Sequence, residues 1–186
     1  MNAEDRFRVA AARVPSVGEA HPQSLSKGHA MSIRFVALES ELVKSLQAGG
    51  LDANGQKPER HISPGGMMPC RHCLADIKEG VPYLVLAHRP FPAAQPYAEL
   101  GPIFLHAEPC ARHAESEDAP RMFLEREAYL IRGYSADHRI VYGTGRMVAP
   151  GLMAEVARET LRDPRVRYIH VRSARNNCYQ CRIDLA

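Results

Sequence analysis

The stretch RVRYIHVRSARNNCYQCRIDL, residues 165–185, decides the fold class of this chain. Residues 165–171 and 178–185 each carry the β-branched, aromatic and apolar residues that are typical of a strand. The loop SARNN, residues 173–177, separates them with polar turn residues, and such a short connection joins antiparallel neighbours. The C-terminus is therefore predicted to be a pair of antiparallel strands.

Outward from this pair, most of the remaining chain is also predicted to form strands that follow one another through short turns. Two short helices interrupt them, at residues 39–47 and at residues 151–162, where Pro150 begins the second helix and Pro164 ends it. This order predicts an α+β fold, a single compact domain with a mostly antiparallel sheet and two or three short helices. The further strands are expected at residues 33–38, 81–88 and 101–107, with a hairpin of residues 127–135 and 139–148.

The first 30 residues differ in composition from the rest of the chain. They are rich in Ala, Pro, Ser, Gly and His and have no sustained apolar period, so they offer little surface to bury. We therefore expect a flexible N-terminal extension at residues 1–30 and a single α+β domain at residues 31–186, which begins at Met31.

Composition and charge indicate a globular protein. Of the 186 residues, 45% are hydrophobic and 24% are charged, and the net charge of +3 is too mild to argue for nucleic acid. No apolar run approaches the roughly 20 residues that cross a bilayer, and the N-terminus lacks the apolar core of a secretory signal. We therefore expect a cytoplasmic protein with reduced thiols and no membrane partner, and the odd number of cysteines, five, also argues against a disulfide framework.

The segment PCRHC, residues 69–73, contains two cysteines separated by two residues. A redox pair of this kind lies between a strand and a helix, whose N-terminus lowers the pKa of the thiol. Here the preceding SPGGMMP is not typical of a strand, and Gly80 and Pro82 leave no room for a long helix. A zinc knuckle fits better, because a tight turn then points both thiolates into one tetrahedral site.

Two further zinc ligands must come from elsewhere in the chain. In CARH, residues 110–113, the preceding Pro109 suits the first turn of a helix, which would place Cys110 and His113 at i and i+3 on one face. The order of knuckle, strand pair and helix N-terminus, over residues 70–113, resembles treble-clef zinc modules. The predicted ligands of one zinc ion are therefore Cys70, Cys73, Cys110 and His113.

A second CxxC, formed by Cys178 and Cys181, competes with Cys110 and His113 for this role. On a regular strand its two cysteines point to opposite faces and cannot bind one ion together, whereas a bulge or turn after residues 176–177 would allow it. Cys178 is otherwise expected to be a small buried hydrophobe, as free cysteine usually is. Both ligand pairs remain open, and Cys110 with His113 is preferred.

The C-terminal region is rich in arginine, with seven between residues 158 and 182. Three of them, Arg172, Arg175 and Arg182, are candidates to bind an anionic small molecule near His170. The alternative is a solvated strand face. Few aromatic residues are interleaved with these arginines, so nucleic acid is not an expected partner.

A family resemblance is carried by PCRHCLADI, GPIFLHA and DPRVRYIHVRSARNNCYQCRIDLA, which together resemble a bacterial family known as domain of unknown function 1203. The resemblance covers residues 33–186 and implies a small α+β bacterial protein with no named activity. The family pattern does not require Cys73, Cys110 or Cys181, so the zinc prediction rests on this chain alone. The matched positions are Cys70, Arg71, residues 101–104, Cys178 and Arg182.

Three functions fit these residues. The first, which is preferred, is a zinc-stabilised binding or regulatory module without catalysis. The second is a small enzyme that uses the thiolate of Cys178 or Cys70, with His170 or His106 as base and Arg182 holding an anionic substrate; both histidines lie in apolar strands, where a hydrogen-bonded core histidine is the commoner outcome. The third is a redox-responsive protein whose cysteine pairs lose zinc and oxidise.

Overall fold

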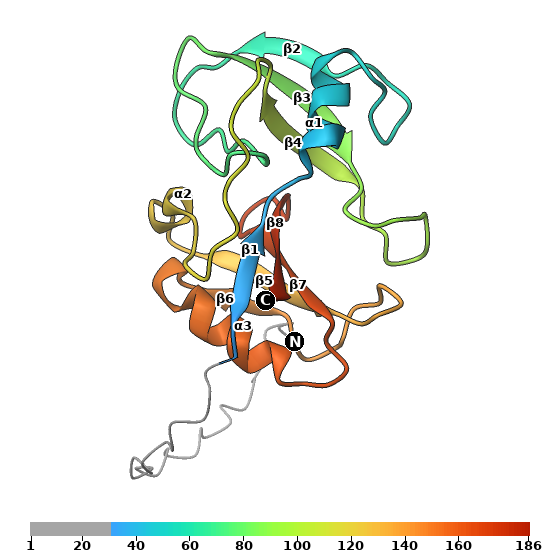
Figure 1. The fold of residues 1–186 in the computed structure, drawn as a ribbon, viewed down its shortest axis with the longest axis vertical. Helices are drawn as coiled ribbons and strands as arrows, with labels where there is room; N and C mark the ends of the chain where they lie inside the picture. Colours follow the sequence, from blue (N-terminus) through green and yellow to red (C-terminus); the bar gives the residue numbers. More distant parts are fainter. Residues whose placement is uncertain (1–30) are drawn as a thin grey trace, which may run out of the picture. The chain divides into compact units, whose positions relative to one another are not determined.

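Eight strands form two antiparallel sheets in the computed structural model, which describes residues 31–186 (Figure 1). The five-stranded sheet has the order β1-β8-β7-β5-β6, and the three-stranded sheet has the order β2-β3-β4. The predicted N-terminal extension, residues 1–30, lies outside the described residues. In chain order the elements are β1 (Ile33–Val36), α1 (Ser40–Gln47), β2 (Glu59–Ile62), β3 (Pro82–His88), β4 (Gly101–His106), α2 (Arg121–Leu124), β5 (Tyr129–Tyr134), β6 (Arg146–Val148), the 3-10 turn η1 (Pro150–Leu152), α3 (Met153–Leu161), β7 (Tyr168–Ser173) and β8 (Tyr179–Leu185).

The mixed fold with mostly antiparallel pairing agrees with the α+β class predicted from the sequence. β7 and β8 pair as the C-terminal stretch predicted, with His170 opposite Arg182. The hairpin after β5 is shorter than predicted, since only residues 146–148 of its second strand are formed. Gly143, with φ of 90°, turns the chain out of an extended conformation just before β6. Across residues 31–186, every helix falls short of the length and hydropathy needed to cross a bilayer.

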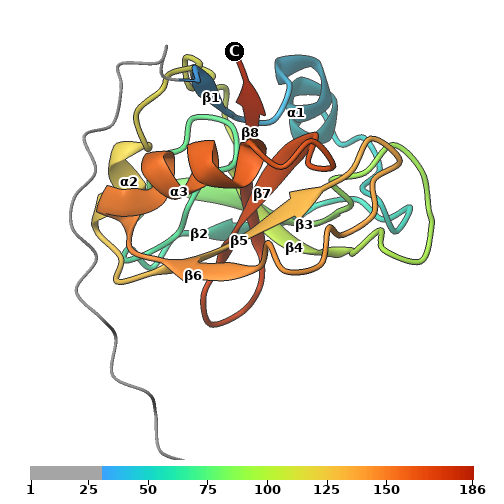
Figure 2. The same ribbon diagram turned by 90° about the horizontal axis from the view of Figure 1, so that it is seen from below.

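The main core lies between the five-stranded sheet and α3, which covers one face of it (Figure 2). Alternate residues of β5, β7 and β8 point to this face, as the two-residue period of a strand requires. From the helix, Met153 and Ala157 point back at the sheet. The fully buried side chains that meet here include Ile131, Ile169, Val171, Ile183, Met153 and Ala157.

The opposite face of the same sheet carries charged residues, and its central part on β7 is nevertheless buried. His170 on β7 lies between Arg132 on β5 and Arg182 on β8, and it is 1% exposed. Phe91, from the loop after β3, covers the imidazole with ring centroids 5.1 Å apart. The central strand β7 is therefore buried on both faces although the sheet is antiparallel.

Glu99 provides the counter-charge for this buried face. Its carboxylate accepts a hydrogen bond from Arg132 Nη1 at 2.8 Å and forms an ion pair with Arg172 Nη2. The Tyr134 hydroxyl also donates to it, at 3.3 Å. Because only 4% of the Arg172 side chain is exposed, the guanidinium depends on this carboxylate for compensation.

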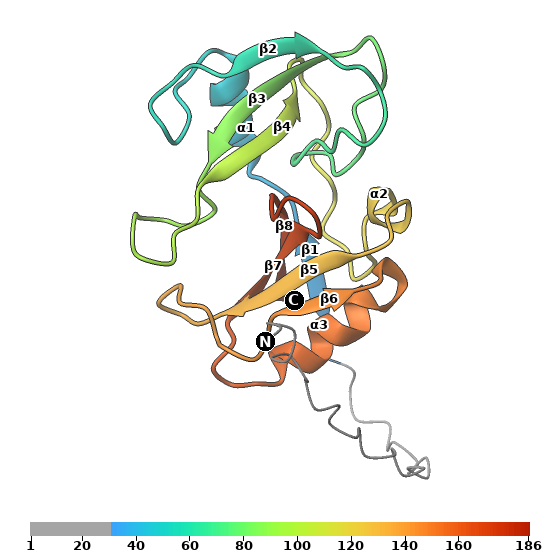
Figure 3. The ribbon, with the colours of Figure 1, turned by 180° about the vertical axis from the view of Figure 1, so that it is seen from behind.

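The three-stranded sheet packs against α1 and forms a second core (Figure 3). Val43 and Leu46 of the helix lie at spacing i, i+3 and contact the apolar residues of β3 and β4. Cys70 belongs to the same buried cluster, with no exposed surface. The sheet residues of this core are Leu84, Leu86, Ile103 and Leu105.

We predict that Glu99→Gln destabilises the fold by about 2 kcal/mol or more, because it leaves the buried Arg172 charge without its partner. Urea unfolding followed by circular dichroism measures the change. Glu159→Gln is the matched control, since Glu159 pairs with Arg146 on the surface, where an ion pair contributes less than about 1 kcal/mol. Equal effects of the two substitutions would contradict the role given to Glu99.

A second prediction concerns pH. Burial, helped by the nearby Arg172, Arg182, His88 and Arg132, lowers the pKa of His170 well below its usual value. The unfolded chain therefore binds a proton near pH 6.5 that the folded chain does not, and stability is lost as the pH falls from about 6.5 towards the folded pKa. Between pH 7.5 and pH 5, His170 alone should remove about 2 kcal/mol from the free energy of unfolding.

His170→Gln removes this contribution and leaves the other histidines in place. Urea unfolding at a series of pH values should therefore show a smaller loss of stability in the variant than in the wild-type protein. The same pH dependence in both proteins would mean that His170 becomes protonated in the folded state.

Candidate metal centre

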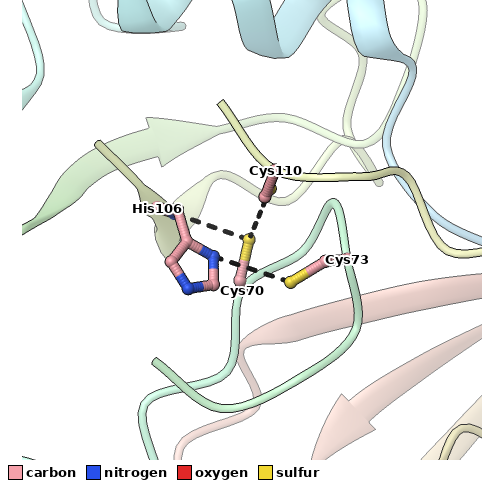
Figure 4. A group of neighbouring side chains, drawn as sticks. All are labelled: Cys70, Cys73, His106 and Cys110. Atoms are coloured by element: carbon pink, nitrogen blue, oxygen red, sulfur yellow. Dashed lines mark hydrogen bonds between the residues drawn. The ribbon is translucent and has the colours of Figure 1, made fainter. Parts of the chain in front are cut away.

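Three cysteines and one histidine converge beside the end of β4 (Figure 4). One ligand atom from each residue, three sulfurs and one imidazole nitrogen, lies within 4.8 Å of all the others. Cys70 is fully buried and the other three are partly buried. The group consists of Cys70, Cys73, His106 and Cys110.

The first two cysteines lie on a tight turn that its own backbone closes. The Leu74 amide donates to the Cys70 carbonyl at 3.0 Å, and the Cys70 amide donates to the Ala75 carbonyl at 3.0 Å. Leu74 has φ of 48°, a left-handed conformation that costs a non-glycine residue about 1 kcal/mol and is found at functional sites more often than elsewhere. The turn brings both sulfurs to the same side, as a zinc knuckle requires.

His106 and Cys110 come from the end of β4 and the loop that follows it. The Arg71 backbone amide donates a hydrogen bond to the Phe104 carbonyl at 3.1 Å, and this bond holds the turn against β4. The distances within the group are then 4.0 Å between the sulfurs of Cys70 and Cys110 and 3.6 Å between Cys73 Sγ and His106 Nδ1. In tetrahedral zinc sites with Zn–S of about 2.3 Å, the sulfurs lie about 3.8 Å apart, so the observed separation suits a metal ion.

The protonation of these four groups is interdependent. Hydrogen bonds from Cys110 and Cys73 lower the pKa of the buried Cys70 thiol, and the hydrogen bond to Cys70 raises the pKa of Cys110. Hydrogen bonds to Cys70 and Cys73 raise the pKa of His106 to about 10. A metal ion would bind the same atoms as deprotonated thiolates and a neutral imidazole, so its binding would release protons from the group.

His72, the middle residue of the CxxC, contacts the group from outside it. Its Nδ1 lies 3.2 Å from Cys110 Sγ, and its Nε2 lies 2.9 Å from Ser40 Oγ at the start of α1. Imidazoles and amides that hydrogen-bond to ligating sulfurs orient them and adjust their basicity. His72 therefore connects the candidate ligand Cys110 to α1.

The sequence prediction placed His113 in this group, and the structure places His106 there. The reason is that no helix follows Pro109, so the predicted i, i+3 face does not exist. The chain from Pro109 to Glu115 has no regular helix or strand, and the His113 amide donates to the His72 carbonyl at 2.9 Å. Three of the four predicted ligands, Cys70, Cys73 and Cys110, do lie together.

The apolar strand around His106 predicts a core histidine, with the role of a base as the alternative. A strand end is, however, where a side chain can turn from the sheet towards a loop, and His106 is the last residue of β4. Its spacing of four residues from Cys110 was the available signal. That spacing alone does not tell whether the chain after β4 bends back so that Cys110 lies beside His106. Here the bend is held by Arg112, which binds the carbonyls of Ala37 and Leu38 at 3.0 Å.

The second CxxC does not reach this group. Cys181 lies in β8, is 1% exposed and packs in the main core. Cys178 lies in the turn before β8 and is partly exposed. Burial raises the pKa of Cys181, so its thiol is a neutral core residue.

The three arginines proposed for an anion lie in different surroundings. Arg172 is buried and pairs with Glu99. Arg182 Nε contacts Asp184 at 2.5 Å, and its guanidinium lies 4.1 Å from the centre of the Tyr168 ring. Arg175 lies in the exposed turn between β7 and β8. The anion site itself remains a proposal.

Comparison with known proteins adds a family but no activity. The family model described as Protein of unknown function (DUF1203) matches residues 67–184, which include all four residues of the cysteine–histidine group. Comparisons with curated proteins and with solved structures gave no match.

Proposed function

We propose that this chain, which belongs to the family described as Protein of unknown function (DUF1203), is a binding or regulatory module stabilised by one zinc ion. The observation that carries the proposal is the convergence of three sulfurs and one imidazole nitrogen within 4.8 Å. Soft thiolate and imidazole ligands in a tetrahedral arrangement suit zinc better than hard cations. The proposed ligands are Cys70, Cys73, His106 and Cys110.

A structural role is favoured over a catalytic one by the number of ligands. Four protein ligands fill a tetrahedral shell, whereas catalytic zinc sites keep one position open for water or substrate. Cys70 has no exposed surface, which also limits access of a substrate to the ion. The ion would therefore connect parts of the chain rather than take part in a reaction.

The segments that the ion would join are separate in sequence. The knuckle supplies Cys70 and Cys73, the end of β4 supplies His106, and the following loop supplies Cys110. That loop has no regular secondary structure between Pro109 and Glu115. Metal–ligand bonds would therefore hold the loop in place, as interstrand hydrogen bonds hold a strand in a sheet. Metal binding would thus add directly to the stability of the three-stranded sheet.

We predict that the purified full-length protein carries about one zinc ion per chain and that a strong chelator lowers its melting temperature by roughly 10 °C or more. The reason is that the binding free energy of a structural ion is part of the folding free energy. Elemental analysis and thermal unfolding with and without chelator measure the two quantities. A protein that carries no metal after purification and does not bind added zinc would contradict the proposal.

The ligand set can be tested with two matched pairs of variants. Cys110→Ser should lower zinc content and stability, whereas Cys181→Ser removes a core thiol and should leave zinc content unchanged. His106→Gln should weaken zinc binding at least about tenfold in a competition with a chromophoric chelator, whereas His113→Gln should not. Loss of zinc in His113→Gln with retention in His106→Gln would restore the ligand set predicted from the sequence.

His72 should affect zinc affinity without being a ligand. We expect His72→Phe to weaken zinc binding about 10-fold to 100-fold, because Cys110 loses the imidazole at 3.2 Å, while the stoichiometry stays at one ion per chain. Competition with a chromophoric chelator gives the affinity, and elemental analysis at saturating zinc gives the stoichiometry. A variant with unchanged affinity would show that the contact has no influence on the metal.

A further inference from the structure

A cavity of about 810 Å³ opens next to the knuckle, and its volume is within the range of small-molecule sites. Its walls come from the knuckle, β4, β5 and the turn before β8, which are distant in sequence. Arg71, the residue after Cys70, lines it together with Phe104 of β4 and Cys178. None of the proposed zinc ligands lines this cavity, so it is a second candidate site.

Arg71 is a buried cation without an anionic partner among residues 31–186. It is 2% exposed. Its Nε donates to the Tyr179 carbonyl at 2.8 Å, its Nη1 donates to the Pro69 carbonyl, and the guanidinium lies 5.5 Å from the centre of the Phe104 ring. Within the described chain, its Nη2 has no hydrogen-bond partner and no carboxylate forms an ion pair with it.

Two other arginines of this region, one partly buried and one buried, show the contrast. Arg126, which lines the same cavity, makes two hydrogen bonds to Asp76 at 2.6 and 2.7 Å. Arg172 pairs with Glu99. Arginine stays protonated in proteins, and a buried charge is costly unless it is paired. Arg71 therefore has an unused capacity to bind a carboxylate, for which its planar guanidinium is well suited.

The rest of the cavity indicates which kind of anion it would accept. Its walls are largely apolar, so the ligand needs an apolar body as well as an acidic group. Gln180, 2% exposed, offers one more buried polar group, and Arg175 lies exposed at the edge. Glu125 and Glu127 also line the cavity but are exposed to solvent. The apolar wall residues include Met67, Pro69, Pro102, Phe104, Tyr129 and Met147.

We propose that this cavity binds a small organic carboxylate, whose acidic group pairs with Arg71 and whose apolar body packs against Phe104 and its neighbours. Arg175 adds long-range attraction at the entrance. The proposal does not depend on the zinc site, because it rests on the cavity and on the unpaired guanidinium. The alternative source of negative charge for Arg71 is the proposed zinc site next to it. One zinc ion with three thiolates and a neutral imidazole carries a net charge of −1.

Cys178 provides a reporter for the test. Its thiol lines the cavity and is partly exposed, whereas Cys181 is buried in the core and the other three cysteines are the proposed ligands. The zinc-loaded full-length protein is treated with iodoacetamide, and alkylation of Cys178 is followed by peptide mass spectrometry. We expect 2-naphthoate to slow this reaction at least about fivefold, and the neutral 2-naphthamide at the same concentration to have little effect.

A second measurement uses the wild-type protein without any ligand. Iodoacetate and iodoacetamide alkylate a thiol by the same displacement of iodide, and they differ in the negative charge of the carboxylate. The ratio of the iodoacetate rate to the iodoacetamide rate at Cys178 should exceed the same ratio for glutathione at least about tenfold, because Arg71 attracts the anion.

Arg71→Gln should lower this ratio to near that of glutathione and remove the protection by 2-naphthoate, while Arg175→Gln should change both only modestly. Zinc content and melting temperature are measured for each variant, and if Arg71→Gln fails to fold, the two wild-type measurements decide. Equal protection by 2-naphthoate and 2-naphthamide, or a ratio equal to that of glutathione, would overturn the proposal. The Arg71 charge would then be compensated from the side of Cys70 alone.

Discussion

The turn at residues 70–75 holds together three parts of the chain that are distant from one another in sequence. Its backbone binds β4 through Phe104, the connection between β1 and α1 through Leu38, and the loop after β4 through His113, with N···O distances between 2.9 and 3.1 Å. Two of these three segments, β4 and the loop after it, contribute side chains to the cysteine–histidine group, as the turn itself does. A metal ion at the centre of the cysteine–histidine group would replace the hydrogen bonds between these side chains by four metal–ligand bonds. It would thereby stabilise the contacts of the turn together.

The five-stranded sheet depends on a different compensation. An antiparallel sheet can leave one face in water, yet here the loop from Arg89 to Leu100 covers the central part of the second face, where Phe91 packs on His170 and Glu99 pairs with Arg172. The cost of burying a guanidinium is offset by Glu99, which comes from that same loop. Covering the face and supplying the counter-charge are therefore done by one segment, so the loop and the sheet stabilise each other.

Arg71 connects these two parts of the molecule. Its backbone belongs to the knuckle, its Nε binds the carbonyl of Tyr179 at the start of β8, and its guanidinium lines the large cavity. The proposed metal centre and the proposed carboxylate site thus share one short turn. Because Cys70 and Arg71 are adjacent, any change in the metal site that alters the turn also alters the position of the guanidinium in the cavity.

The sequence by itself determined the local features of this protein. The positions of β1, β3, β4, β5, β7, β8, α1 and α3 followed from apolar patterns and from Pro150 and Pro164, whereas β2 and α2 were not predicted. The tight turn with two thiols followed from the spacing of Cys70 and Cys73. These features depend on residues that are close in the chain, where periodicity and turn chemistry decide the conformation.

Only the tertiary structure decided which distant residues meet. No helix forms after Pro109, and Arg112 binds the carbonyls of residues 37 and 38 instead. The loop therefore brings Cys110 to the knuckle and turns His113 away. In the same way Glu99, from the loop after β3, reaches Arg172 on the face of the five-stranded sheet, while Arg71 has no carboxylate partner among residues 31–186. The hydrophobic effect is non-directional, so an apolar sequence pattern does not specify which polar side chains pair. These pairings depend on where the packed chain places each side chain.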